Sequence, residues 1–409
     1  YQSHIKKAPI YTKGDALKLR EFIKKYIIYG DNKESLYKID KGRLKPSKSL
    51  QSSLKKMLKG SQEFKLIDDQ KLVYENAKLM ALKSYKDKKR RVLIVDGGPG
   101  TGKSVIAINL LVNLTAAGGV VHYISKNSAP RNVYSAKLKG TTTRTHIDNL
   151  FKGSGIFHDA KIKIFDALIV DEAHRLNAKS GMFKNKGENQ IKEIICASKF
   201  SVFFIDESQR VDIYDIGDKK SIENFAKEQN ALMEIMSLES QFRCGGSDGY
   251  IAWLDDLLGI RQTANDDGFE MAYDFRVFDD PNELKKAIEL KNKVNNKSRI
   301  VAGYCWDWKK EGRSKSHLPN INIEEFNFSM SWNLDNTATW AIDKESVNEI
   351  GCIHTSQGLE FDYVGVIIGP DLSYNEGKII TDFTKRAKTD QSLRGIKKLA
   401  KENPLKAKK

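Results

Sequence analysis

Residues 91–104 read Arg-Val-Leu-Ile-Val-Asp-Gly-Gly-Pro-Gly-Thr-Gly-Lys-Ser, and this stretch decides the fold. Its apolar half, residues 92–95, predicts a buried strand, and residues 104–114 predict an apolar helix behind it. Between the two, residues 97–104 fit the pattern GxxxxGK[ST]. Glycines in such a loop let backbone N–H groups turn toward phosphate oxygens, and the helix N-terminus adds positive potential. The stretch therefore predicts a phosphate-binding loop in an α/β protein.

Strands and helices alternate along most of the chain. Further strands are predicted at residues 120–124, 167–170, 201–205, 276–278, 299–304 and 363–368. This alternation indicates parallel sheets that are covered on both faces, and the later runs predict a second α/β unit. Residues 310–348, with Trp332 and Trp340 among polar side chains, are expected to form an insertion with short strands.

The positive charge of the chain is concentrated at its two ends. The 409 residues carry a net charge of +16, of which residues 1–60 contribute +11 and residues 381–409 contribute +7. Helices are predicted at residues 15–30 and 47–59, so residues 1–60 are expected to form a small basic helical unit. Such ends favour a polyanion such as nucleic acid as partner, although solvated helix faces explain them equally well.

Composition also excludes several classes of protein. A hydrophobic content of 40% excludes a wholly disordered chain, and no apolar run approaches the roughly 20 residues of a membrane span. The four cysteines are far apart and form no CxxC pair, which argues against a disulfide framework and a zinc ribbon and favours the cytoplasm. No protein-held zinc or iron centre is expected.

A second acidic motif completes the predicted nucleotide site. Residues 171–174, Asp-Glu-Ala-His, end the apolar run at 167–170. We expect Lys103 to bridge the β- and γ-phosphates of ATP, and Ser104 and Asp171 to hold Mg²⁺. Glu172 would orient and deprotonate the attacking water. An acidic strand end alone is often only a solvated loop, but here it follows a phosphate-binding loop.

With these motifs in place, the chain resembles superfamily 1 helicases, and most closely the bacterial Schlafen-group-3-like DNA/RNA helicase domain family. The resemblance covers roughly residues 60–400. It rests on DEAH, on Phe-Phe-Ile-Asp-Glu-Ser-Gln-Arg at 203–210, on Glu-Ser-Gln-Phe-Arg at 239–243, and on Ile-His-Thr-Ser-Gln-Gly-Leu-Glu-Phe-Asp at 353–362. Weaker likenesses lie at residues 125–129 and 145–147 and at Gln70.

The resemblance implies a role for each matching residue. Catalytic roles fall to Lys103, Glu172, Gln209 as a γ-phosphate sensor, and Arg243 as a γ-phosphate contact from the second lobe. Contacts to strand phosphates or bases are expected from Asn127, Thr145, His146 and His354. Independently of the resemblance, Tyr123, Trp306 and Trp308 are candidates for base stacking, although aromatic residues at a strand end more often pack in the core. Nucleotide binding is expected from Gln70 on adenine, Phe242 stacked on adenine, Glu360 on a ribose hydroxyl, and Gly98, Pro99, Gly100, Thr101, Gly102, Lys103, Ser104 and Gly358.

One motif of the superfamily has no good match. Its members carry an apolar strand that runs into a Thr-Arg pair near the C-terminus. Residues 384–388, Thr-Lys-Arg-Ala-Lys, are only superficially similar, because Lys385 intrudes and no apolar strand precedes them. We therefore expect this strand and its arginine to be missing, which would weaken ATP turnover.

The sequence thus predicts an α/β protein of two RecA-like parallel-sheet lobes. We expect a basic helical unit at 1–60, lobe 1 at 61–215, lobe 2 at 216–380, and a basic, truncated C-terminal segment at 381–409. The expected activity is an ATP- and Mg²⁺-dependent helicase or translocase on single-stranded DNA or RNA. The alternatives are a nucleotide-dependent switch ATPase, a motor module that serves a nuclease in a defence system, and a non-enzymatic DNA-binding protein. Sequence does not separate DNA from RNA, nor fix direction or oligomeric state.

Overall fold

The computed structural model describes residues 14–25, 50–59, 61, 63–64, 66, 68–141, 143–181, 185–212, 214–240, 248–260, 273–307, 319–332, 338–376, 378–390 and 392–403. The chain divides into two units, Tyr1–Ser47 and Lys48–Lys409. In the first unit, helix α2 (Ala16–Lys24) has no buried residue and carries two short-range ion pairs, Lys18 with Asp15 and Lys24 with Glu21. The other described elements belong to the second unit.

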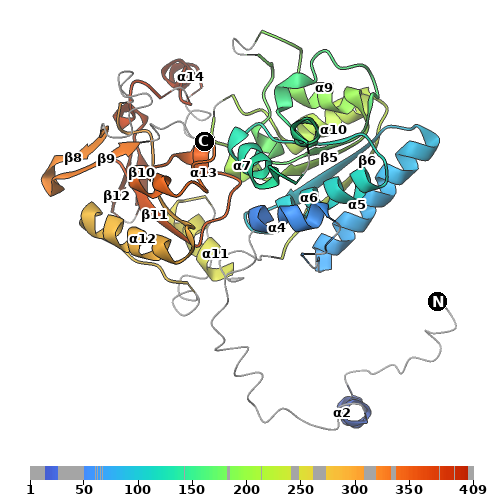
Figure 1. Cartoon of the computed structure of the whole chain (residues 1–409), viewed down its shortest axis with the longest axis horizontal. Helices are drawn as coiled ribbons and strands as arrows, with labels where there is room; N and C mark the ends of the chain where they lie inside the picture. The colour runs from blue at the N-terminus through green and yellow to red at the C-terminus, as the bar shows by residue number, and fades with distance from the viewer. Residues whose placement is uncertain are drawn as a thin grey trace. The chain divides into compact units, whose positions relative to one another are not determined.

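The second unit contains a six-stranded sheet, which with its helices is called lobe 1 (Figure 1). Its order is β3-β2-β4-β5-β1-β6, and every neighbouring pair is parallel. The strands are β1 (Arg91–Gly97), β2 (Val121–Ile124), β3 (Phe151–Lys152), β4 (Phe165–Val170), β5 (Ser198–Ile205) and β6 (Leu232–Leu238). Parallel strands need crossover connections, and here helices supply most of them.

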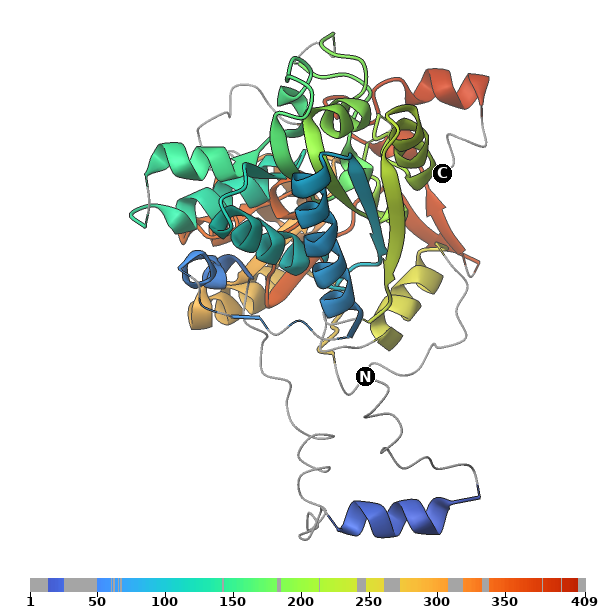
Figure 2. The same cartoon turned by 90° about the vertical axis from the view of Figure 1, so that its right-hand side faces the viewer.

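Both faces of the sheet are buried, as the continuous apolar strands predict. Alternate side chains of β1 pack into two different cores: Leu93 and Val95 on one face, Val92 and Ile94 on the other. Two helices cover the second face: α9 (Gln190–Ala197) and α10 (Lys219–Glu228). Five cover the first: α4 (Leu50–Leu58), α5 (Asp68–Asp87), α6 (Lys103–Ala116), α7 (Ser128–Leu138) and α8 (Arg144–Leu150). Figure 2 shows α5 in front of the first face, and α5 packs along α6.

Helix α4 corrects the expected boundary at residue 60. Leu50, Leu54 and Met57 follow helical spacing and are buried in the first core of lobe 1, where α4 packs on α6 and α7. The expected helix at 47–59 is therefore present but belongs to lobe 1 rather than to a separate basic unit. The spacing of its apolar residues predicted a helix but not the surface on which it packs.

Strand β6 corrects the expected boundary at residue 215. Residues Arg91 to Gly97 of β1 pair in parallel with Leu232 to Leu238 of β6, which places β6 at the edge of the lobe 1 sheet. Lobe 1 therefore extends to the end of β6, and α10 provides the crossover into it.

Lobe 2 is the second α/β body. Strand β7 (Ser298–Ala302) pairs in parallel with β11 (Tyr363–Ile367), and β9 (Phe328–Trp332) lies between β8 (Ile321–Ile323) and β10 (Glu349–Ile350). A parallel bridge between Val301 and Gly351 joins the two groups, with Gly351 N–H donating to the Ile300 carbonyl at 2.9 Å. The main helix is α12 (Pro281–Asn295), and the short α13 (Ile353–Ser356) follows β10.

The remaining elements are small. They are α11 (Asp248–Leu257), the hairpin β12 (Leu372–Asn375) with β13 (Lys378–Thr381), and α14 (Ile396–Glu402). The strand predicted at 276–278 is wrong, because those residues form no ladder. Short strands do occur between residues 319 and 332, where an insertion was expected. None of the described helices combines the length and the apolar character that crossing a membrane requires.

Candidate nucleotide site between the two lobes

The phosphate-binding loop connects β1 to α6, as predicted. Gly100 and Gly102 have φ angles of +81° and +89°, which only glycine adopts without strain. A Cβ at Gly102 would also meet the side-chain amide of Gln70, so glycine leaves room for that residue. Open space surrounds the Cβ position of Gly98. The glycines therefore make a concave backbone surface at the N-terminus of α6.

Lys103 places a positive charge inside this loop. Its ammonium donates to the carbonyl oxygens of Gly97 at 2.6 Å and Gly98 at 2.7 Å, and the side chain is buried. Thr101 Oγ1 also donates to the Gly98 carbonyl at 3.0 Å. The loop is thus folded around its own lysine. Because N–H groups and an ammonium face the same concavity, the site suits an anion.

An oxygen cluster lies beside the lysine. Asp171, at the end of β4, accepts hydrogen bonds on Oδ2 from Ser104 Oγ and from the Tyr123 hydroxyl, both at 2.6 Å. Burial, and then the neighbouring Glu172, raise the pKa of Asp171. A hydroxyl and a carboxylate are ligands that suit Mg²⁺, so Ser104 and Asp171 fit the expected metal role. Tyr123 is fully buried, which corrects its prediction as a base-stacking residue: its hydroxyl orients Asp171 instead.

Glu172 is held in an uncommon backbone conformation. Its φ of +54° lies in the left-handed region, where a non-glycine residue is strained. Nε2 of His174 lies 3.0 Å from Glu172 Oε2, while His174 Nδ1 accepts from the N–H of Asp206 at 3.3 Å. Since Nδ1 accepts, Nε2 carries the proton and faces the carboxylate. The buried histidine thus lies between the Glu172 carboxylate and the end of β5.

Gln209 lies in the 3₁₀ turn Glu207–Gln209, which follows β5. Its amide donates to Asp206 Oδ2 at 2.9 Å, and Asp206 Oδ1 accepts from the Ser208 N–H at 3.1 Å. The acidic residue after β5 thus fixes the turn that carries Gln209.

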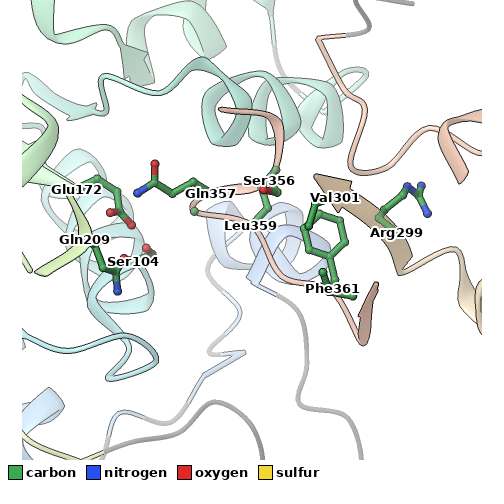
Figure 3. A pocket seen from close by; sticks show the side chains of 11 residues that line it. Ser104, Glu172, Gln209, Arg299, Val301, Ser356, Gln357, Leu359 and Phe361 are labelled. Atoms are coloured by element: carbon green, nitrogen blue, oxygen red, sulfur yellow. The ribbon is translucent and has the colours of Figure 1, made fainter. Parts of the chain in front are cut away.

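These side chains face lobe 2 across a cavity of about 250 Å³ (Figure 3). Lobe 1 contributes Ser104, Glu172 and Gln209. Lobe 2 contributes Arg299, Val301, Ser356, Gln357, Gly358, Leu359, Phe361 and Val364. The cavity therefore brings together predicted residues from motifs far apart in the sequence: the phosphate-binding loop, the DEAH strand, the turn after β5 and the segment 353–362.

Arg299 is not a free cation at this cavity. Its guanidinium donates to Asn292, Asn296 and Ser346 and to the Asp343 carbonyl, and in Figure 3 it points away from the lobe 1 side chains. Burial lowers the pKa of Arg299 to about 10. It holds lobe 2 together.

Gln70 lies against the phosphate-binding loop. Its Nε2 donates to the carbonyl of Thr101 at 3.0 Å, and the side chain is buried at the start of α5. The preceding Asp69 accepts from the N–H of Glu239 at 2.7 Å and of Ser240 at 3.2 Å. The start of α5 thereby joins this loop to the end of β6. The predicted Phe242 and Arg243 follow directly but lie outside the described residues, as does Trp308.

The segment 356–361 of lobe 2 contacts lobe 1 more closely than predicted. Gly358 has φ +80°, and a Cβ there would lie 2.8 Å from Cγ of Pro130 on α7. Glu360 Oε2 accepts from the N–H of Leu50 at 3.0 Å, so in this structure it caps α4. The ribose contact of Glu360 stays a prediction beside this contact to α4. Gly358 does line the cavity.

The predicted strand-binding residues fall into two groups. Thr145 and His146 are exposed on the first turn of α8. Asn127 is buried: its Oδ1 caps α7 at Ala129, and its Nδ2 donates to the carbonyl of Gln357 at 3.0 Å. Both ends of its amide are engaged in this arrangement, and its contact to a strand stays a prediction.

His354 and Trp306 belong to lobe 2 and lie against other residues of that lobe. His354 lies on α13 with its ring 5.9 Å from that of Tyr304, and burial, then Arg175 and Lys126, lower its pKa. Trp306 packs against the lobe 2 core, which agrees better with a core role than with stacking on bases.

Arg386 lies where the missing motif was sought, and it stays within lobe 2. Its Nε donates to Asp390 at 2.8 Å, and Nη1 lies 3.7 Å from Asp371. The 3₁₀ turn before it, Phe383–Lys385, is not preceded by an apolar strand of the main sheet.

Sequence reasoning missed a buried ionic cluster beside the site. It consists of Lys126, Arg175 and Asp215, and it reaches Gln357 of lobe 2. Arg175 could have indicated this cluster from the sequence. It directly follows DEAH, in a turn between two apolar strands, and a charged residue that is buried there must find a partner.

Comparison with known proteins agrees with the family resemblance. Residues 90–409 match the family model described as Schlafen group 3, DNA/RNA helicase domain. An uncharacterized protein of Saccharomyces cerevisiae is 23% identical over 320 residues, which are 69% of this chain and 69% of that protein.

Similar solved structures include a DNA replication initiation factor (TM-score 0.27, 14% identity, 57% of this chain and 64% of that chain). They also include the Pif1 helicase of Candida albicans (TM-score 0.30, 13% identity, 56% and 55%). A third is the SWI2/SNF2 ATPase core of Sulfolobus solfataricus in complex with double-stranded DNA (TM-score 0.25, 9% identity, 75% and 90%). This chain thus spans under two thirds of the first two structures.

Proposed function

Because the chain belongs to the Schlafen group 3 DNA/RNA helicase domain family, with a helicase-like P-loop NTPase fold, we propose that it is an ATP-driven translocase or helicase on single-stranded nucleic acid. The cavity of about 250 Å³ is the observation that carries this proposal. Its two walls come from different lobes, so a nucleotide bound there contacts both. Nucleotide binding and hydrolysis would then change the spacing of the lobes.

The described residues divide the chemistry among them. The loop glycines and Lys103 bind the phosphates, and the amide of Gln70 is close enough to the loop to contact the adenine. When bound, Mg²⁺ would be held by Ser104 and Asp171 and would neutralise phosphate charge. Glu172 accepts a proton from the attacking water on its carboxylate, and the Nε2–H of His174 orients that carboxylate. Gln209 lies across the cavity from Gln357, in a position to respond to the γ-phosphate.

The strand partner is inferred from charge and exposure. The exposed Thr145 and His146 at the N-terminus of α8 are suited to a phosphate contact. The net charge of +11 in residues 1–60 and of +7 in residues 381–409 adds a sequence-independent attraction to nucleic acid. Neither feature distinguishes DNA from RNA.

Phosphate release with single-stranded DNA, single-stranded RNA or neither tests the proposal. We expect the wild-type chain to release phosphate faster with a strand present, and Lys103→Ala to abolish this release. Lys192→Ala, at a partly exposed lysine on α9 that pairs with Glu188, serves as the matched control. Unchanged release in Lys103→Ala would refute the site. Turnover without strand displacement on forked substrates would instead assign a nucleotide-dependent switch.

A further inference from the structure

The buried ionic cluster crosses from lobe 1 to lobe 2. Lys126 donates to Asp215 Oδ1 at 2.6 Å and to Asn177 Oδ1 at 2.9 Å. Nε of Arg175 lies 3.0 Å from the other oxygen of Asp215. The second edge of the guanidinium, Nη1, donates to Oε1 of Gln357, which belongs to lobe 2. One arginine thus contacts both lobes.

The burial of Arg175 explains why the cluster uses an acceptor from lobe 2. Asp215 and the nearby Asp212 carry the negative charges that face Lys126 and Arg175. The side chains of Asp215 and Arg175 are 0% and 3% exposed, so water does not solvate the guanidinium. A buried guanidinium must find acceptors for its N–H groups. Gln357 provides such an acceptor, from the other lobe.

A short, hydrogen-bonded turn connects Arg175 to Glu172. The two residues bound the 3₁₀ turn Ala173–Arg175, in which the Arg175 N–H donates to the Glu172 carbonyl at 2.9 Å. His174, within the turn, faces the Glu172 carboxylate. Because Glu172 is strained at φ +54°, its position depends on how this turn is held.

The position of Gln357 depends on how lobe 2 lies against lobe 1. Its backbone carbonyl accepts from Asn127 at 3.0 Å, and the next residue, Gly358, approaches Pro130. The positive charges of Arg175 and Lys126 also act on His354, one turn earlier on α13. The side chain of Gln357 therefore moves with the segment that docks lobe 2 on lobe 1.

We propose that Arg175 is a positioning residue that couples lobe docking to Glu172. With Gln357 bound, the guanidinium holds the turn of residues 172–175 in the arrangement seen here. When the lobes separate, Arg175 loses this acceptor and the turn is freed. An arginine that only stabilised lobe 1 would need only Asp215 as a partner. Arg175 also donates, through the second edge of its guanidinium, to Gln357 of lobe 2. The inference rests on the proposed function and identifies how hydrolysis would be restricted to docked lobes.

The test compares variants that remove or keep the acceptor. Gln357→Leu removes the acceptor at similar size, Gln357→Glu keeps it, and Arg175→Lys keeps a charge for Asp215 but loses the two-edged guanidinium. Arg276→Lys, an exposed arginine that pairs with Asp274, is the matched control. Three readouts are needed: affinity for a fluorescent ADP analogue, strand-stimulated phosphate release, and hydrogen–deuterium exchange of peptides covering residues 171–176 and 353–362.

We expect Gln357→Leu and Arg175→Lys to keep nucleotide affinity but lose strand stimulation by about 10-fold, within the usual range of coupling between sites. Exchange in both peptides should become faster in these two variants. Gln357→Glu should keep the slow exchange of both peptides, and Arg276→Lys should behave like the wild type in all three readouts.

Two results would overturn the inference. One is wild-type exchange and stimulation in Gln357→Leu, and the other is a Gln357→Glu variant whose two peptides exchange as fast as those of Gln357→Leu. A wild-type chain without any turnover would refute the proposed function alone, because the exchange comparison would still decide whether Arg175 and Gln357 hold the turn.

Discussion

The two walls of the cavity are built in different ways. The lobe 1 wall consists of residues at the carboxyl ends of β1, β4 and β5, where three parallel strands with buried faces deliver them to one edge. These side chains contact other residues of lobe 1, as Ser104 does Asp171. The lobe 2 wall combines Arg299, Val301 and Val364 of β7 and β11 with the segment 356–361, and this segment contacts lobe 1 at Asn127, Arg175 and Pro130.

This difference indicates that the lobe 1 wall carries out the reaction and that the lobe 2 wall regulates it. A wall fixed by a packed sheet is preorganised, so its residues are suited to stabilising charge in a reaction. A wall that depends on contacts to the other lobe is in place only when the lobes are docked. Substitutions in the first wall should therefore remove the reaction itself, and substitutions in the second should change its regulation and affect rate less.

The sharpest test of the first wall is Glu172→Gln. Loss of a general base is expected to lower phosphate release by about 10²–10⁴-fold, while nucleotide affinity stays near the wild-type value. Single-turnover release and equilibrium binding measure the two quantities separately. Glu188→Gln on the surface of lobe 1 is the control. A loss of binding equal to the loss of rate would show that Glu172 is structural.

Ser104→Ala should have the next largest effect. Removing the hydroxyl that contacts Asp171 should raise the Mg²⁺ concentration for half-maximal turnover by about 10–100-fold, as losses around metal sites commonly do. A Mg²⁺ titration of phosphate release measures this shift. Ser104→Thr keeps the hydroxyl and should remain close to the wild type; an equal shift in both variants would contradict the metal role.

Gly358→Ala tests the second wall. Its φ of +80° and the 2.8 Å approach to Pro130 both oppose a methyl group, so the free energy of unfolding should fall by about 1–3 kcal/mol. Gly118→Ala is a matched control, because Gly118 has φ +85° but nothing within 4 Å of its Cβ position. Both variants carry the strain, and only Gly358→Ala should also lose strand stimulation. Chemical denaturation and phosphate release distinguish them.

The smallest expected effect is a pH dependence of the second wall. The pKa of His354 is lowered, so the folded state disfavours its charged form. The unfolded chain then binds more protons, and the contribution of His354 to stability is present above its ordinary pKa of about 6.5 and is lost as pH falls below it. After correction for the intrinsic pH dependence of amide exchange, the protection of residues 353–362 should therefore fall from pH 7 to pH 5.5, and His354→Asn should flatten this change. An identical pH profile in the wild type and in His354→Asn would show that His354 is not the cause of the pH dependence.

Local pattern determined more of the first wall than of the second. The apolar run at 92–95, the loop 97–104 and DEAH at 171–174 predict strand ends at one edge of a parallel sheet, and the structure confirms this placement. In contrast, the role expected of Asn127 stays a prediction, because its side chain is engaged at the lobe contact. A motif specifies the residue types available at a site but not the tertiary contacts that compete for them.

The two helices of the N-terminal region show the same limit. Helices α2 and α4 both follow predicted helical patterns, yet α2 has no buried residue and α4 buries Leu54 and Met57 in lobe 1. Periodicity reports that one face of a helix is apolar. It does not report which surface covers that face, and so the boundary expected at residue 60 was misplaced.

The sequence by itself determined the α/β class, the phosphate-binding loop and the acidic strand end, because each depends on residues that are adjacent or a fixed step apart in the chain. Only the tertiary structure revealed that Arg175 meets Gln357, that Glu360 caps α4 and that β6 completes the first sheet. These contacts join residues up to 310 positions apart. They form because burial leaves polar groups in need of partners, and which partner is within reach depends on how the whole chain packs.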